Sequence, residues 1–140
     1  MDAIRQAFYN HYHPNYNMLI CDISYLTAIV SIVALVYGYY GHAFWAAAIF
    51  ITTQLYWRTN DPQLRQIDVF VSGSAMLYHT LIAATSYNSL LYISPIAVGI
   101  LFYGISHFIY TEAWLLESYL AHCAVHVFGN LACILFCLGV

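Results

Sequence analysis

The segment that most constrains the fold of this chain is residues 113–140, which contains no lysine or arginine and one acid, Glu117. A helix needs about 20 mostly apolar residues to cross a bilayer, so this segment of 28 residues (113–140) is long enough to span one. It also carries His122 and His126, which are four residues apart and therefore share one helix face. Ionisable groups are costly at membrane depth and commonly mark functional sites there. The segment predicts a transmembrane helix with a functional group.

The rest of the chain has the same apolar character. Of its 140 residues, 63% are hydrophobic and 6% are charged. So few charged residues cannot cover the surface of a soluble domain of this size. We therefore expect an all-α, polytopic transmembrane helix bundle that forms one domain. The net charge of −3 and the lack of a basic cluster argue against nucleic acid as a partner. Membrane lipid and other membrane protein subunits are the expected partners.

The apolar segments predict about five spans, over residues 18–37, 42–57, 67–86, 89–108 and 113–140. Residues 1–17 are expected at the membrane interface, because they are rich in tyrosine, histidine and asparagine. The second span is short, at about 16 residues, and 58–66 is expected to be a polar loop. Short connections make sequential helices antiparallel neighbours. Arg5, Arg58 and Arg65 then fall on one side of the membrane, which predicts an N-terminus inside and a C-terminus outside.

Polar groups of the third and fifth predicted spans are expected in the same, inner half of the membrane. Asp68 lies near the start of the third span, and His122 and His126 lie early in the fifth. A carboxylate that faces two imidazoles is typical of a zinc site. We therefore expect His122 and His126 to be metal ligands, with Asp68 as a catalytic base or orienting group. Ser118, four residues before His122 on the same stripe, is a second catalytic candidate. The alternative is that each histidine only hydrogen-bonds a neighbouring helix.

The order of Thr53, Trp57, Asp68 and the pair His122 and His126 resembles the superfamily of alkaline ceramidases and progestin/adiponectin receptors. In that family a serine and a histidine end the second helix, an aspartate opens the third, and two histidines lie on the last helix. The resemblance implies a divergent zinc-dependent intramembrane hydrolase of lipid amides. The chain departs from the family pattern in three ways. Trp57 stands at the position of the first zinc histidine, Thr53 stands at that of the serine, and about five spans replace seven.

A b-type haem is the alternative cofactor. Histidines on different spans at similar depth can be its axial ligands. The candidates are His79 in the third span and His107 in the fourth, together with His122 or His126. Such a chain would be a haem-binding membrane anchor of a respiratory-type complex. His107 and Glu112, near the inner end of the fourth span, are also the expected substitutes for the missing zinc ligand.

The principal interpretation is structural, as an integral membrane subunit with an assembly role in a larger complex. The loops are too short to form a receptor or a catalytic domain, and partner subunits would bury the polar groups of the spans. The cysteines form no C-x-x-C pair, and we expect them to be small buried hydrophobes; they are Cys21, Cys123, Cys133 and Cys137. Enzymatic activity stays an open question at this level.

Overall fold

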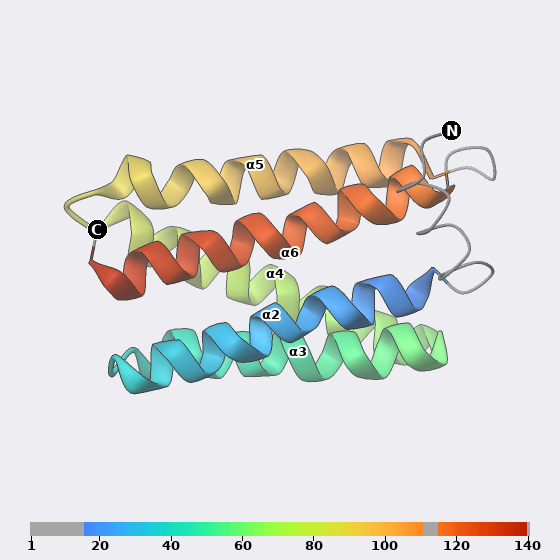
Figure 1. Ribbon diagram of the computed structural model, residues 1–140, viewed down its shortest axis with the longest axis horizontal. Coiled ribbons are helices and arrows are strands. Elements are labelled where there is room, and N and C mark those ends of the chain that lie inside the picture. The colour runs from blue at the N-terminus through green and yellow to red at the C-terminus, as the bar shows by residue number, and fades with distance from the viewer. Residues whose placement is uncertain (1–15, 111–114, 140) are drawn as a thin grey trace, which may run out of the picture.

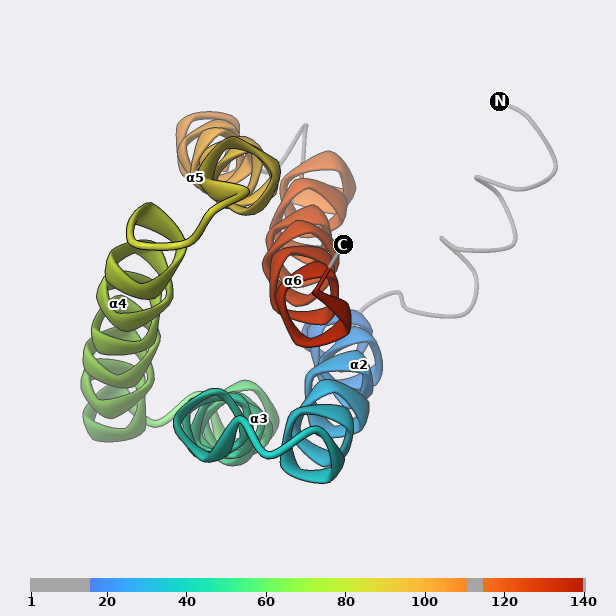
Figure 2. The ribbon, with the colours of Figure 1, turned by 90° about the vertical axis from the view of Figure 1, so that its left-hand side faces the viewer.

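A computed structural model of the protein describes residues 16–110 and 115–139, which form five α-helices. These are α2 (Asn17–Val36), α3 (Tyr40–Thr59), α4 (Pro62–Ala84), α5 (Ser89–Phe108) and α6 (Leu115–Leu138). The helices run side by side (Figure 1). Viewed along their axes they form a ring, in which α6 packs against both α5 and α2 and so closes the circle (Figure 2). The predicted all-α bundle is confirmed.

Four of the described helices, α2, α4, α5 and α6, are long and apolar enough to cross a membrane. The remaining helix, α3, has 20 residues, as many as α2, and lies between α2 and α4 in the ring. The fifth span at this position stays a prediction. The helix is longer than the predicted span at 42–57, because it continues through the polar residues at its end.

The connection between α3 and α4 is much shorter than the predicted loop at 58–66. Asn60 ends α3 in the left-handed conformation (φ 56°), a common way to terminate a helix. The Asp61 carboxylate then accepts a hydrogen bond from the Gln63 backbone N–H at 2.7 Å, and Pro62 opens the first turn of α4. The polar residues therefore lie in the end turns of two helices, where caps satisfy the backbone.

The opposite end of the ring contains the turn between α2 and α3. Gly38 adopts φ 81° there, a conformation that costs little only for glycine. We call the two ends of the bundle the Gly38 end and the Asn60 end. Helices α2, α4 and α6 run from the Asn60 end to the Gly38 end, and α3 and α5 run back, because the connected helices alternate in direction (Figure 1).

Polar side chains join α2 to both of its neighbours. The Gln54 side-chain amide of α3 donates hydrogen bonds to the Cys21 carbonyl at 2.7 Å and to the Ser24 hydroxyl at 2.8 Å. On the other side, the Asn130 amide of α6 donates to the Thr27 hydroxyl at 3.0 Å. Hydrogen bonds of this kind help to hold helices together in lipid, where packing gains little from the hydrophobic effect.

Helix α5 contains Pro95 and nevertheless continues to Phe108. Proline removes the backbone N–H that would bond to the carbonyl four residues earlier. The Ser94 hydroxyl donates to that carbonyl, of Leu91, at 3.4 Å, which partly replaces the lost bond. One turn later, Gly99 lies against α6, since a Cβ added there would be 3.7 Å from the Phe128 Cβ. Helices α5 and α6 can therefore approach each other closely at this point.

Candidate metal centre

Side chains from helices that are not neighbours meet inside the ring. The His122 ring of α6 lies 5.2 Å from the Trp57 ring of α3 and 6.1 Å from the Tyr103 ring of α5, measured between centroids. Near the other end, His42 of α3 stacks on Phe136 of α6, with centroids 4.5 Å apart. Because α3 and α5 lie on different sides of the ring (Figure 2), these residues must face its interior. The inner faces of the helices are therefore where a site can form.

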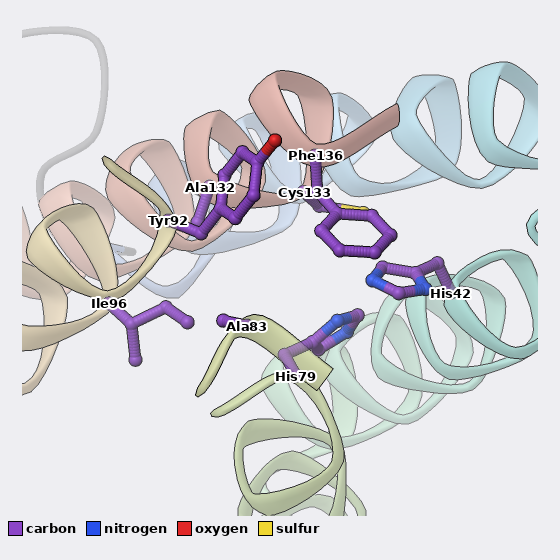
Figure 3. Close-up of a pocket in the computed structure, with 8 residues that line it drawn as sticks. All are labelled: His42, His79, Ala83, Tyr92, Ile96, Ala132, Cys133 and Phe136. Atoms are coloured by element: carbon purple, nitrogen blue, oxygen red, sulfur yellow. The ribbon is translucent and has the colours of Figure 1, made fainter. Parts of the chain in front are cut away.

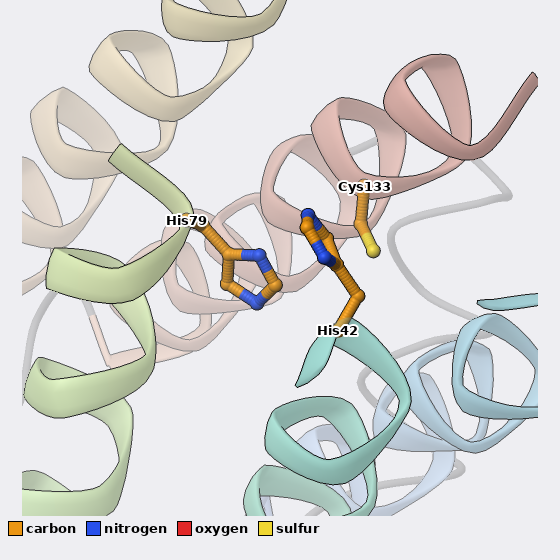
Figure 4. A group of neighbouring side chains, drawn as sticks. All are labelled: His42, His79 and Cys133. Carbon is orange, nitrogen blue, oxygen red and sulfur yellow. The ribbon is translucent and has the colours of Figure 1, made fainter. Parts of the chain in front are cut away.

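Three side chains that can ligate a metal converge in the Gly38 half of the interior. They are His42 of α3, His79 of α4 and Cys133 of α6 (Figure 4). One ligand atom from each, an imidazole nitrogen or the Sγ, lies within 4.8 Å of the other two. His42 and Cys133 are buried and His79 is half-buried. In the part of the chain that the structure describes, no other group of three or more His, Cys, Asp or Glu residues meets in this way.

The three residues line a small cavity of about 10 Å³ (Figure 3). A space of this size holds about one water molecule. The remaining wall is mostly apolar and comprises Ala83, Tyr92, Ile96, Ala132 and Phe136. The two imidazole rings lie 4.7 Å apart between centroids, and neither hydrogen-bonds to a described residue. Their nitrogen atoms are therefore free to bind something that enters the cavity.

Two imidazole nitrogens and one cysteine sulfur form a donor set that suits zinc or copper. Tetrahedral zinc, with bonds of about 2.1 Å to nitrogen and about 2.3 Å to sulfur, would bring the donor atoms to roughly 3.5 Å from one another. Small side-chain rotations would therefore be enough to close the set around an ion. Cys133 would bind as a thiolate and release its proton. Three protein ligands leave a fourth position for water or another molecule.

The predicted metal ligands His122 and His126 lie in the Asn60 half of the ring. Their rings are 5.7 Å apart between centroids, so the structure does bring the pair together. The residues around His122 are aromatic, with Trp57 on one side and Tyr103 on the other. The Trp57 Nε1 is buried and has no hydrogen-bond acceptor among the described residues. No third ligand side chain of the described residues closes on this pair in the way that Cys133 closes on His42 and His79.

The two predicted catalytic residues lie at different helix contacts. Asp68 accepts hydrogen bonds through one carboxylate oxygen from the Thr52 hydroxyl at 2.7 Å and the Thr53 hydroxyl at 3.2 Å, which joins α4 to α3. Ser118 is buried between α6 and α5 and donates to the Ser106 carbonyl at 2.8 Å. The interactions of Asp68 and Ser118 are therefore with neighbouring helices, and the structure does not gather the two residues around one centre.

The two haem candidates lie at opposite ends of the ring. His79 is near the Gly38 end of α4, beside His42, whereas His107 is exposed in the last turn of α5 at the Asn60 end. The haem alternative pairs each of them with His122 or His126 and stays a prediction. Glu112 and residues 1–15 of the expected interfacial segment lie outside the described residues.

The sequence did not single out His42, and it assigned Cys133 to packing. A spacing of 11 residues could have found them. Eleven residues make about three helical turns, so residues at this spacing share a face and lie roughly 16 Å apart along the axis. Three helices contain such a pair, namely His42 and Thr53, Asp68 and His79, and His122 and Cys133.

Comparison with protein-family models, with curated proteins and with solved structures gives no match to this chain. The fold and the site define its class as a helical membrane bundle with a His, His, Cys group in its interior. Any function beyond this class must be inferred from the chemistry of the residues themselves.

Proposed function

We propose that the protein binds a zinc or copper ion inside the membrane bundle, through His42, His79 and Cys133. The observation that carries this proposal is the approach of three ligand atoms from three different helices to within 4.8 Å of one another. A pair such as His122 and His126 shares a helix face through its spacing alone. No such local rule brings His42, His79 and Cys133 together, so their convergence is a property of the whole fold.

The cavity supports a single ion in preference to the haem alternative. Its volume is about 10 Å³, which suits an ion with one small ligand and is far too small for a porphyrin. A bound ion would connect α4 to α3 and α6, helices on different sides of the ring. Such a connection is in keeping with the expected structural role, but its anchor would be a metal rather than a partner subunit.

The test is the metal content of the full chain purified in mild detergent. After incubation with zinc and removal of the excess, we expect about one ion per chain. His79→Ala should weaken zinc binding by about 100-fold or more, because even partners of metal ligands contribute 10- to 100-fold. His107→Ala is the matched control, since His107 is an exposed histidine of the same bundle. A native chain that retains no zinc, or an equal loss in both variants, would contradict the proposal.

Cobalt gives a second readout that is specific to the sulfur ligand. Cobalt bound to a thiolate absorbs light through charge transfer from sulfur, so we expect this band in the native chain and its loss in Cys133→Ala. Cys137→Ala is the matched control, because Cys137 is also buried and lies one turn further along α6. Persistence of the band in Cys133→Ala would show that another cysteine binds the metal.

A further inference from the structure

A second layer of polar groups faces the interior of the ring, roughly 16 Å from the metal centre. The Gly38 layer consists of His42, His79 and Cys133, and the Asn60 layer consists of Thr53, Asp68 and His122. Each residue of one layer is 11 positions from a residue of the other on the same helix, and residues at that spacing share a face. The two layers therefore lie one above the other along the three helices α3, α4 and α6.

Contacts between the three helices place the Asn60 layer at one depth. The Thr53 hydroxyl donates to the Asp68 carboxylate at 3.2 Å, which fixes α3 against α4. The Trp57 ring, one turn beyond Thr53, lies 5.2 Å from the His122 ring of α6 between centroids. The same three helices that supply the metal centre therefore also supply this layer.

The face of α6 between the two layers contains a further imidazole and an open space. His126 lies four residues beyond His122 in the direction of Cys133, roughly 6 Å along the helix. Gly129 follows on the same face, and a Cβ added there would meet no atom within 4 Å. Because His122 and Cys133 both face the interior, the free space beside Gly129 lies inside the ring. An ion that leaves one layer therefore has both a ligand and room before it reaches the other.

The groups along this route that could bind a metal keep atoms that are not engaged in hydrogen bonds to described residues. Neither His122 nor His126 hydrogen-bonds to a described residue, and the hydrogen bonds from Thr52 and Thr53 use one of the two carboxylate oxygens of Asp68. Ionisable residues that face the interior of a membrane bundle characteristically mark ion pathways. Asp68 and Cys133 lie near the two ends of the route, and each binds a metal in its deprotonated form, which offsets part of the charge of a divalent cation.

We infer that the interior of the ring is a transport path for the metal ion, along which zinc passes between the Asn60 layer and the Gly38 layer by way of His126. This inference rests on the proposed metal centre and adds movement across the membrane to binding. Cys133 releases its proton to water when the ion binds and regains one when the ion leaves, so no proton is lost over the cycle and the bound centre carries one net positive charge.

The test is zinc entry into liposomes that contain the full chain and an enclosed zinc-sensitive dye. Gly129→Leu fills the open space on the inner face and leaves every ligand in place. We therefore expect the rate of zinc entry to fall about tenfold or more, while the amount of zinc bound per chain stays unchanged. Gly73→Leu is the matched control. Gly73 of α4 also has free space around it, but its position, five residues after Asp68, turns it away from the inner face. The Gly73→Leu variant should therefore transport zinc at the native rate.

His126→Ala is the second variant and keeps the test decisive if Gly129→Leu does not fold. It removes the intermediate ligand and should slow zinc entry about fivefold or more, while zinc bound per chain in detergent stays the same. Entry no faster than in protein-free liposomes, with one zinc still bound per chain, would overturn the transport path and leave the metal centre standing. Absence of bound zinc would overturn both. Equal rates of zinc entry in the native chain, in Gly129→Leu and in His126→Ala would also overturn the path.

Discussion

Helices α2 and α4 are both long and apolar enough to cross a membrane, yet they are packed into the ring in different ways. Helix α2 has many buried residues, namely Leu19, Ile20, Cys21, Ser24, Thr27, Val30 and Ala34. Helix α4 is longer but buries only Ala75 and Ala83. The buried hydroxyls of α2, on Ser24 and Thr27, are hydrogen-bonded to neighbouring helices. His79 of α4, in contrast, is half-buried and makes ring contacts but no hydrogen bond to a described residue.

The difference separates polar residues that hold helices together from polar residues that are left for a ligand. A hydrogen bond between two spans replaces the water that lipid cannot supply. A polar group without such a bond is costly at the same depth, so its retention on the inner face of α4 is in keeping with binding. Four measurements can sharpen or break this distinction, beginning with the largest expected effect.

Zinc should stabilise the bundle mainly through α4. At a free zinc concentration of 100 times the Kd, binding to the folded state alone adds about 2.7 kcal/mol to the free energy of unfolding. We expect slower hydrogen exchange in α4 on zinc addition and little change in α2. His79→Ala should remove the effect. Equal protection of α2 and α4, or full stabilisation of the variant, would break the distinction between the two helices.

Gln54→Leu should destabilise the contact between α3 and α2. The side-chain amide of Gln54 donates to both Cys21 and Ser24, so its loss removes two hydrogen bonds between α3 and α2 and leaves only the bond from Ser24 to Cys21 within α2. We expect the free energy of unfolding to fall by about 1–2 kcal/mol, with or without zinc. Reversible unfolding in mixed detergent measures it. Gln66→Leu is the control, because Gln66 is an exposed residue of α4. It should change the free energy of unfolding by about 0.5 kcal/mol at most.

Asp68→Asn should have a smaller effect on stability than Gln54→Leu. The asparagine carbonyl can still accept the hydrogen bonds that Thr52 and Thr53 donate to the aspartate. Interhelical hydrogen bonds in membranes average about 0.6 kcal/mol, so we expect a loss of about that size or less. The same unfolding assay checks it. A loss greater than that of Gln54→Leu would show that α4 is held as tightly as α2.

Gly73→Ala should raise stability slightly. Gly73 lies within α4 with nothing within 4 Å of an added Cβ, and alanine favours a helix over glycine by about 0.5–1 kcal/mol. Gly41→Ala is the opposing case, because the Tyr78 hydroxyl occupies the space that its Cβ would take. The midpoint of thermal unfolding should rise in the first variant and fall in the second. A fall in both would show that Gly73 is needed for packing.

Much of the fold follows from hydrophobic length alone. The span at 89–108 begins and ends at the predicted residues, because an apolar run between two polar turns has few alternatives in a bilayer. The segment 58–66 was predicted as a loop because it is polar. The cap at Asp61 and the proline at position 62 overrode that polarity, since both favour the start of a helix.

The candidate site was only partly accessible from the sequence. Alternation of the predicted spans places Asp68 and His122 at the same end of the bundle, and in the structure both lie in its Asn60 half. It could not show that Cys133 approaches His79, because the order of helices around a ring is not fixed by their order in the chain. That approach depends on α6 packing against α2, a parallel contact that no short loop dictates.

The closure of the ring by α6 also has a consequence for the insertion and assembly of the protein. If spans enter the membrane in chain order, α2 to α5 form an open crescent in which His42 and His79 have no sulfur opposite them. Cys133 arrives only with the helix that completes the circle. A metal ion held by all three residues would therefore be retained by finished molecules and lost from truncated or misinserted ones. Retention of the proposed ion would therefore distinguish complete bundles from incomplete ones.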